Sequence, residues 1–145
     1  MRSLSPSLED YLEAVYGLSR ADGSTRAGLV GGRLKVSKPS VNAAIKALAT
    51  RGLLRHERYG SIRLSPRGLR AGAEIADRHA LLKDFFISIL AMAAPRAERD
   101  ACRAEHALSR EALRRVGKLA VFLKAPARRR TLAKAGLYIS GRKRV

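Results

Sequence analysis

The chain has 145 residues, and 46% of them are apolar, which is enough to bury a core and argues against wholesale disorder. Its 30 Lys and Arg residues against 12 Asp and Glu give a net charge of +18, which predicts a polyanionic partner, either nucleic acid or an anionic membrane face. No apolar run approaches the roughly 20 residues of a membrane span, no secretory signal opens the chain, and one cysteine cannot form an intrachain disulfide, so we expect a cytoplasmic protein without a membrane partner.

The first part of the chain predicts three helices. Ser5 before a proline and two acidic residues is typical of a helix start, and this helix continues to about Ser19. A second helix is predicted over residues 26–34, although its three glycines weaken it by roughly 1 kcal/mol each relative to alanine. Ser37 is the expected N-cap of a third helix, which Gly52 ends.

The rest of the chain predicts a hairpin, more helices and a basic end. Two short strands, residues 53–58 and 61–65, surround a Tyr-Gly pair and form a wing. A long helix from Pro66 to about Leu90 follows, and then two helices over residues 96–108 and 109–123. The last segment, residues 124–145, has eight Lys or Arg and no acid, and we interpret it as a basic tail, for which disorder is one reading, that either adds phosphate affinity or merely solvates the chain.

Helix, turn, helix and hairpin within about 45 residues predict a winged helix-turn-helix, whose second helix enters the major groove of DNA with its N-terminal part. Serine hydroxyls and free helix amides there can bind phosphate, and an asparagine side chain can read a base edge. The alternative is a solvated helix face on which Ser37 is only a cap. The predicted contacts are Ser37, Lys38, Pro39, Ser40, Asn42 and Lys46 on the helix, and Arg58 and Tyr59 in the wing.

Side chains that can bind a metal recur at helical spacing. Asp10 and Glu13 are three residues apart, Cys102, Glu105 and His106 share one late helix face, and His79 lies between the two groups. Carboxylate and imidazole suit Mn²⁺ and Fe²⁺, and a thiolate adds softness. Spacing alone leaves ordinary roles open, because a lone cysteine is usually a small buried side chain and such triples also arise by chance.

An enzyme is not expected. Cys102 beside His106 has the composition of a thiolate–imidazolium pair, but no Gly-rich turn that would stabilise an oxyanion is visible, and the pair lies within a helix. Nothing in the sequence points to a substrate cleft, so we expect no small organic substrate.

Four motifs together resemble the DtxR/MntR family of metal-dependent transcriptional repressors. They are residues 7–16, 36–41, 78–82 and 100–109, and the likeness extends over about residues 5–123. The resemblance implies a mainly α fold with an N-terminal winged helix-turn-helix and a helical dimerisation and metal-binding domain. We place these domains at residues 1–73 and 74–123, followed by the basic tail at 124–145, and expect no SH3-like third domain in a chain of this length.

The resemblance also implies a metal ligand set, which is mixed in type. Manganese-type members usually have the two first-helix acids but a Glu at the place of Cys102, whereas iron-type members usually have Cys there but Met at the place of Asp10. Iron-type members often carry Glu where this chain has Lys83, so a second, ancillary site would need another donor such as Glu98. The implied ligands are Asp10, Glu13, His79, Cys102, Glu105 and His106.

The function implied is a metal-responsive transcriptional regulator, a repressor, that binds a double-stranded DNA operator as a homodimer when Fe²⁺ or Mn²⁺ is bound. The alternative from the residues is a metal-independent basic protein that binds nucleic acid or shapes it. In that alternative Cys102, Glu105 and His106 are packing and surface residues.

Overall fold

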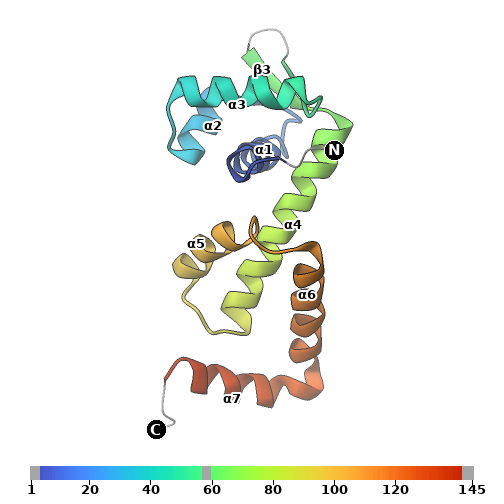
Figure 1. Ribbon diagram of the computed structural model, residues 1–145. Coiled ribbons are helices and arrows are strands. Elements are labelled where there is room, and N and C mark those ends of the chain that lie inside the picture. Colours follow the sequence, from blue (N-terminus) through green and yellow to red (C-terminus); the bar gives the residue numbers. More distant parts are fainter. Residues whose placement is uncertain (1–3, 57–59, 142–145) are drawn as a thin grey trace. The chain divides into compact units, whose positions relative to one another are not determined.

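The computed structural model describes residues 4–56 and 60–141, and the chain divides into two compact units, Met1–Ala76 and Asp77–Val145 (Figure 1). Within the described residues, none of the helices combines the length and the apolar character needed to cross a membrane.

The first unit contains the three predicted helices: α1 (Pro6–Leu18), α2 (Ala27–Leu34) and α3 (Lys38–Thr50). Serine N-caps begin two of them, because the hydroxyls of Ser5 and Ser37 accept hydrogen bonds from backbone amides three residues later. A proline in the first turn of each helix has the backbone angle that a helix start requires.

A three-stranded antiparallel sheet completes the first unit. Strands β2 (Leu54–His56) and β3 (Ser61–Leu64) form the predicted hairpin, and β3 also pairs with a two-residue strand, β1 (Thr25–Arg26), which the sequence pattern did not predict. The tip of the hairpin, with the predicted contacts Arg58 and Tyr59, lies outside the described residues.

The core of the first unit is mainly aliphatic, with Tyr11 as an aromatic member. Close packing explains one of the three glycines of α2, because a Cβ at Gly31 would lie only 3.3 Å from a methyl carbon of Val41 on α3. The largest fully buried apolar side chains here are Leu12, Val15, Val30, Val41, Leu48 and Ile62.

The second unit is entirely helical in its described part. Helix α4 (Pro66–Ser88) begins in the first unit and continues into the second, where α5 (Ala94–Ala104) and α6 (Arg110–Lys124) follow. The core here is small. It consists of Leu82, Ala101 and Leu113, with Leu81, Phe86, Ala104 and Val116 packed against them.

Two features of the second unit differ from the sequence prediction. The helix predicted over residues 96–108 ends at Ala104, whose carbonyl accepts the amides of Ala107 and Leu108, so Glu105 is a C-cap and His106 lies in the turn. The segment interpreted as a basic tail contains a 3-10 helix, η2 (Pro126–Arg128), and a further helix, α7 (Arg129–Ile139). The basic composition of this segment therefore did not predict its helical structure.

Candidate metal centre and nucleic-acid interface

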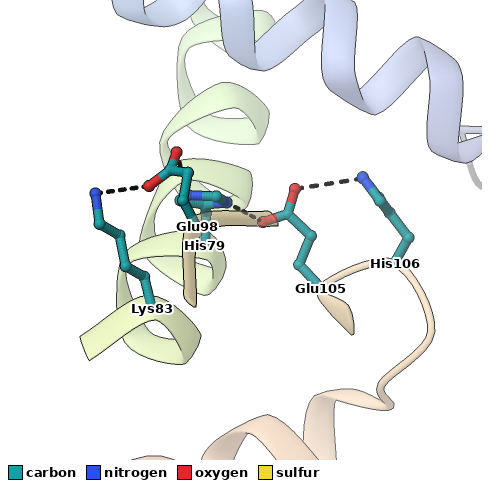
Figure 2. Close-up of polar contacts among 5 residues, drawn as sticks. All are labelled: His79, Lys83, Glu98, Glu105 and His106. Carbon is teal, nitrogen blue, oxygen red and sulfur yellow. Dashed lines mark hydrogen bonds and ion pairs between the residues drawn. The ribbon is translucent and has the colours of Figure 1, made fainter. Parts of the chain in front are cut away.

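A fully buried carboxylate, that of Glu105, lies at the centre of a polar cluster in the second unit (Figure 2). Its Oε2 atom is 2.9 Å from Nδ1 of His79, and its Oε1 atom is 3.3 Å from Nε2 of His106. Both imidazoles are nearly buried, with 15% and 10% of their side chains exposed. His79 from α4 and His106 from the turn after α5 thus converge on the carboxylate of Glu105, the C-cap of α5.

The Glu105 carboxylate lacks a permanent counter-charge. No Lys or Arg pairs with it among the described residues, and His106 does not meet hydrogen-bond geometry, so Oε1 is left without a hydrogen-bond partner there. A buried ionised carboxylate is costly unless it is paired with a cation or bound to a metal. The cluster therefore has the charge and the unsatisfied oxygen of a cation site.

The distances also suit a cation. Two ligand atoms about 2.1 Å from one ion are about 3.0 Å apart at a right angle and about 3.4 Å apart at a tetrahedral angle. The observed separations of 2.9 and 3.3 Å between carboxylate oxygens and imidazole nitrogens match these values. Imidazole nitrogen and carboxylate oxygen are donors that Mn²⁺, Fe²⁺ and Zn²⁺ all accept.

The other predicted ligands occupy both units. Cys102 is on the last turn of α5, exposed, with its sulfur within 4.8 Å of a Glu105 carboxylate oxygen. Asp10 and Glu13 lie one turn apart on α1 of the first unit, and both are half-buried. The second unit by itself therefore brings four of the six predicted ligands together.

Glu98 and Lys83 extend the cluster in a way that the sequence did not predict. Glu98 Oε1 is 3.2 Å from Nε2 of His79, and Glu98 Oε2 is 2.6 Å from Nζ of Lys83. The hydrogen bond from Lys83 is the main reason that the pKa of Glu98 is lowered, and His79 contributes further. Lys83 and Glu98 are on different helices, so only the packing of α4 and α5 reveals their pairing.

The predicted DNA-contacting helix, α3, has one buried and one polar face. Val41, Ala44, Ile45 and Leu48 are buried, whereas the candidate contact residues of this helix are all exposed. The hydroxyls of Ser37 and Ser40 are 2.9 Å apart at the helix start, where the Ser37 hydroxyl also accepts the Ser40 amide. The exposed candidates are Ser37, Lys38, Pro39, Ser40, Asn42 and Lys46.

The hairpin presents two arginines side by side. Arg55 on β2 is the register partner of Arg63 on β3, and both are exposed. Exposed arginine side chains on a hairpin are of the type that contacts the phosphate backbone of DNA. Arg55 was missed in the sequence, although its position within the predicted strand could have identified it.

Both units match models of known families. Residues 3–62 match the model described as iron dependent repressor, N-terminal DNA binding domain, and residues 65–129 match iron dependent repressor, metal binding and dimerisation domain. The mainly α fold class, with a winged helix-turn-helix followed by a helical dimerisation domain, is confirmed.

Individual proteins that the chain resembles are also transcriptional regulators. The chain is 32% identical to the HTH-type transcriptional regulator MntR of Listeria welshimeri over 118 residues, covering 81% of this chain and 82% of that protein. It is 31% identical to MntR of Geobacillus kaustophilus, covering 86% and 88%. A solved manganese-dependent transcriptional repressor in complex with manganese is similar at a TM-score of 0.73 and 26% identity, covering 79% of this chain and 53% of its own, so this chain spans about half of that one.

Proposed function

This chain belongs to the DtxR/MntR family of metal-dependent transcriptional repressors, and from that premise we propose that it binds its operator as a homodimer when Mn²⁺ or Fe²⁺ occupies the Glu105 cluster. The observation that carries the proposal is the buried Glu105 carboxylate, with an unsatisfied oxygen and two imidazoles at ligand spacing. The alternative, a metal-independent basic nucleic-acid-binding protein, is not favoured because, in the part of the chain that the structure describes, it leaves this carboxylate without a lysine or arginine to neutralise it.

The proposed ligands are those implied by the sequence resemblance. The cluster geometry supports His79, Glu105 and His106, and Cys102 is supported by its sulfur lying within 4.8 Å of a Glu105 carboxylate oxygen. Asp10 and Glu13 rest on the resemblance of the first helix alone. A bound divalent cation supplies the positive charge that neutralises these carboxylates.

The proposed ligand set comes from both units, and this is the basis of the regulation. Without a cation, Asp10, Glu13 and Glu105 repel one another when they approach, which opposes one fixed placement of the DNA-binding unit. DNA binding by α3 requires such a placement, because two recognition helices of a dimer enter successive major grooves about 34–36 Å apart. Metal and operator then bind with reciprocal coupling, typically about 1–3 kcal/mol.

In the DNA-binding unit, the α3 start and the hairpin have different proposed roles. Ser37 and Ser40 hold phosphate through their hydroxyls, and Asn42 reads a base edge. Arg55 and Arg63 bind the sugar–phosphate backbone from the hairpin.

The test is fluorescence anisotropy on a duplex selected from a random library in the presence of Mn²⁺. We expect Mn²⁺ or, without oxygen, Fe²⁺ to tighten binding to the selected duplex about 5- to 150-fold, and a chelator to reverse the effect at fixed salt. Binding to a random duplex should not respond to the ion. Equal affinity for the selected duplex with ion and with chelator would refute the metal-dependent function.

Two variants test the ligands. Glu105→Gln and His106→Ala should each abolish the metal response but leave weak, salt-sensitive DNA binding, because the net charge of +18 attracts phosphate without regard to sequence. Asp100→Asn is a suitable control, since this acid on α5 pairs with Arg96 on the surface. A full metal response in both ligand variants would show that the ligand assignment is wrong.

The choice between Mn²⁺ and Fe²⁺ depends on Cys102. A thiolate ligand favours the softer Fe²⁺ over Mn²⁺. Anaerobic calorimetry with both ions, on the wild-type chain and on Cys102→Ser, should show a larger loss of affinity for Fe²⁺ than for Mn²⁺. Equal losses would indicate that the thiol does not set the preference between the ions, and no loss for either ion would indicate that it does not coordinate.

A further inference from the structure

We propose that Glu98, held in place by Lys83, is a positioning residue for the metal ligand His79. It keeps the imidazole proton on Nε2 and thereby leaves Nδ1 unprotonated, so that Nδ1 can bind the cation beside Glu105. This inference rests on the proposed function, because it takes His79 and Glu105 as ligands.

The imidazole of His79 lies between two carboxylates. Nδ1 faces Glu105 at 2.9 Å, and Nε2 faces Glu98 at 3.2 Å (Figure 2). A neutral imidazole has one donor nitrogen and one acceptor nitrogen, so only one of the two can donate to its carboxylate while the other binds a metal. One carboxylate therefore accepts the hydrogen bond from His79, and the other binds the metal together with His79.

The surroundings of the two carboxylates distinguish the hydrogen-bond acceptor from the metal ligand. Glu105 is fully buried and has no ammonium or guanidinium partner within the described part of the chain; the His79 ring is the partner of its Oε2 atom, and its Oε1 atom, on the His106 side, has no hydrogen bond there. Glu98 is half-exposed, at 51%, and already has the Lys83 ammonium 2.6 Å from its second oxygen. The carboxylate that still has no cationic partner in that part of the chain is therefore Glu105, which lies next to Nδ1 of the ring, and not Glu98, which lies next to Nε2.

Lys83 gives Glu98 its role. The ammonium holds one oxygen of the carboxylate, which turns the other oxygen toward Nε2 of His79. It also neutralises a charge that would otherwise attract a cation to this side of the ring. The chain Lys83–Glu98–His79 thus orients the ring from outside, an arrangement in which a carboxylate accepts the second N–H of a metal-bound histidine.

The first measurement is calorimetric titration of Mn²⁺ into the full-length chain. Glu98→Ala should raise the Kd about 10- to 100-fold, as expected when the hydrogen-bond partner of a ligating histidine is removed. Glu98→Gln should raise it less, because an amide oxygen still accepts from Nε2, and Lys83→Met should raise it in the same direction. The number of ions bound per chain should stay the same, since Glu98 is not a ligand.

Asp100→Asn is the matched control. It removes the same charge from the same helix, but Asp100 pairs with Arg96 and not with His79. If Glu98→Ala and Asp100→Asn weaken Mn²⁺ binding equally, general electrostatics explains the effect and the positioning role is wrong. If Glu98→Ala instead loses an ion per chain, Glu98 is a ligand and the proposal is also wrong.

The second measurement identifies the nitrogen directly. In the chain loaded with diamagnetic Zn²⁺, ¹⁵N NMR should give His79 Nδ1 a metal-bound shift and Nε2 the shift of a protonated nitrogen. Zinc on Nε2 would overturn the inference while leaving the proposed function intact. A wild-type chain that binds neither Mn²⁺ nor Zn²⁺ would refute the proposed function itself, and the inference with it.

Discussion

Gly68 and Gly32 are both helical, but a methyl group added to each would meet different surroundings. At Gly68 on α4, a Cβ would overlap the backbone carbonyl oxygen of Leu53, whereas nothing lies within 4 Å of a Cβ at Gly32 on α2. We expect Gly68→Ala to destabilise the chain by about 1–3 kcal/mol or more through overpacking. Gly32→Ala should stabilise it by about 0.4–1 kcal/mol, because alanine restricts the unfolded chain. Urea denaturation followed by circular dichroism measures both, and a stable Gly68→Ala would contradict the close approach of α4 to Leu53.

Asp84 is a residue for which the structure predicts a pH effect. Lys124 Nζ donates to both carboxylate oxygens, at 2.9 and 2.7 Å, and this is the main cause of the lowered pKa of Asp84. A lowered folded-state pKa contributes stability above the unfolded pKa of about 3.9, and that stability is lost as the pH falls through the folded value. Since both side chains are more than 40% exposed, solvent screening keeps the contribution small. Carboxyl ¹³C NMR should show the pKa of Asp84 rising in Lys124→Met, and an unchanged value would contradict the ion pair.

At the scale of secondary-structure elements, α7 is the least secured helix of the described chain. It has 11 residues, none of them buried, and no acid in its first turn, while Arg129 and Arg130 stand at the positive end of the helix dipole. We expect its amides to exchange with solvent faster than those of α4 within the second unit. Hydrogen exchange monitored by mass spectrometry measures this. Strong protection of α7 in the dimer would instead show that a second copy covers the helix.

The helices and the hairpin of the first unit were predictable because their signals are local. Serine caps with a following proline began α1 and α3, and the stripe of Val41, Ile45 and Leu48 predicted the buried face of α3. The boundary of α5 was not predictable, since residues 105–108 contain no glycine or proline to end a helix. There the burial of Glu105 and its contacts with two histidines replace a local stop signal.

The candidate site was predictable in its residue types but not in its pairing. Spacing and resemblance predicted His79, Glu105 and His106 as ligands, and the structure places both imidazoles next to the Glu105 carboxylate. The ion pair of Lys83 with Glu98 joins residues 15 positions apart on two helices, so the spacing of residues along one helix could not predict this pair. Glu98 was considered as a metal donor from the sequence, and its pairing with Lys83 is what suggests the positioning role.

At the scale of the whole molecule, the positive charge is greater outside the DNA-binding unit than within it. Residues 1–76 carry 13 Lys and Arg against 6 Asp and Glu, whereas residues 77–145 carry 17 against 6. All of this second excess lies in residues 110–145, whose single acid, Glu111, already pairs with Arg114 and Arg115. Solubility does not require such a concentration of one charge on α6 and α7, but contact with phosphate would use it.

The salt dependence of DNA binding tests this use of the charge. Arg129, Arg130 and Lys134 of α7 are exposed and pair with no acid in residues 4–56 or 60–141. Each phosphate contact contributes about −0.9 to the slope of log K against log salt concentration, because bound counterions are released. We therefore expect the triple variant with glutamine at these three positions to flatten the slope by about 1 to 3 on a random duplex, measured by anisotropy without metal. The double variant Arg114→Gln and Arg115→Gln should change the salt slope less, since Glu111 already offsets those charges. An unchanged slope in the triple variant would show that the charges of α7 only solvate the chain.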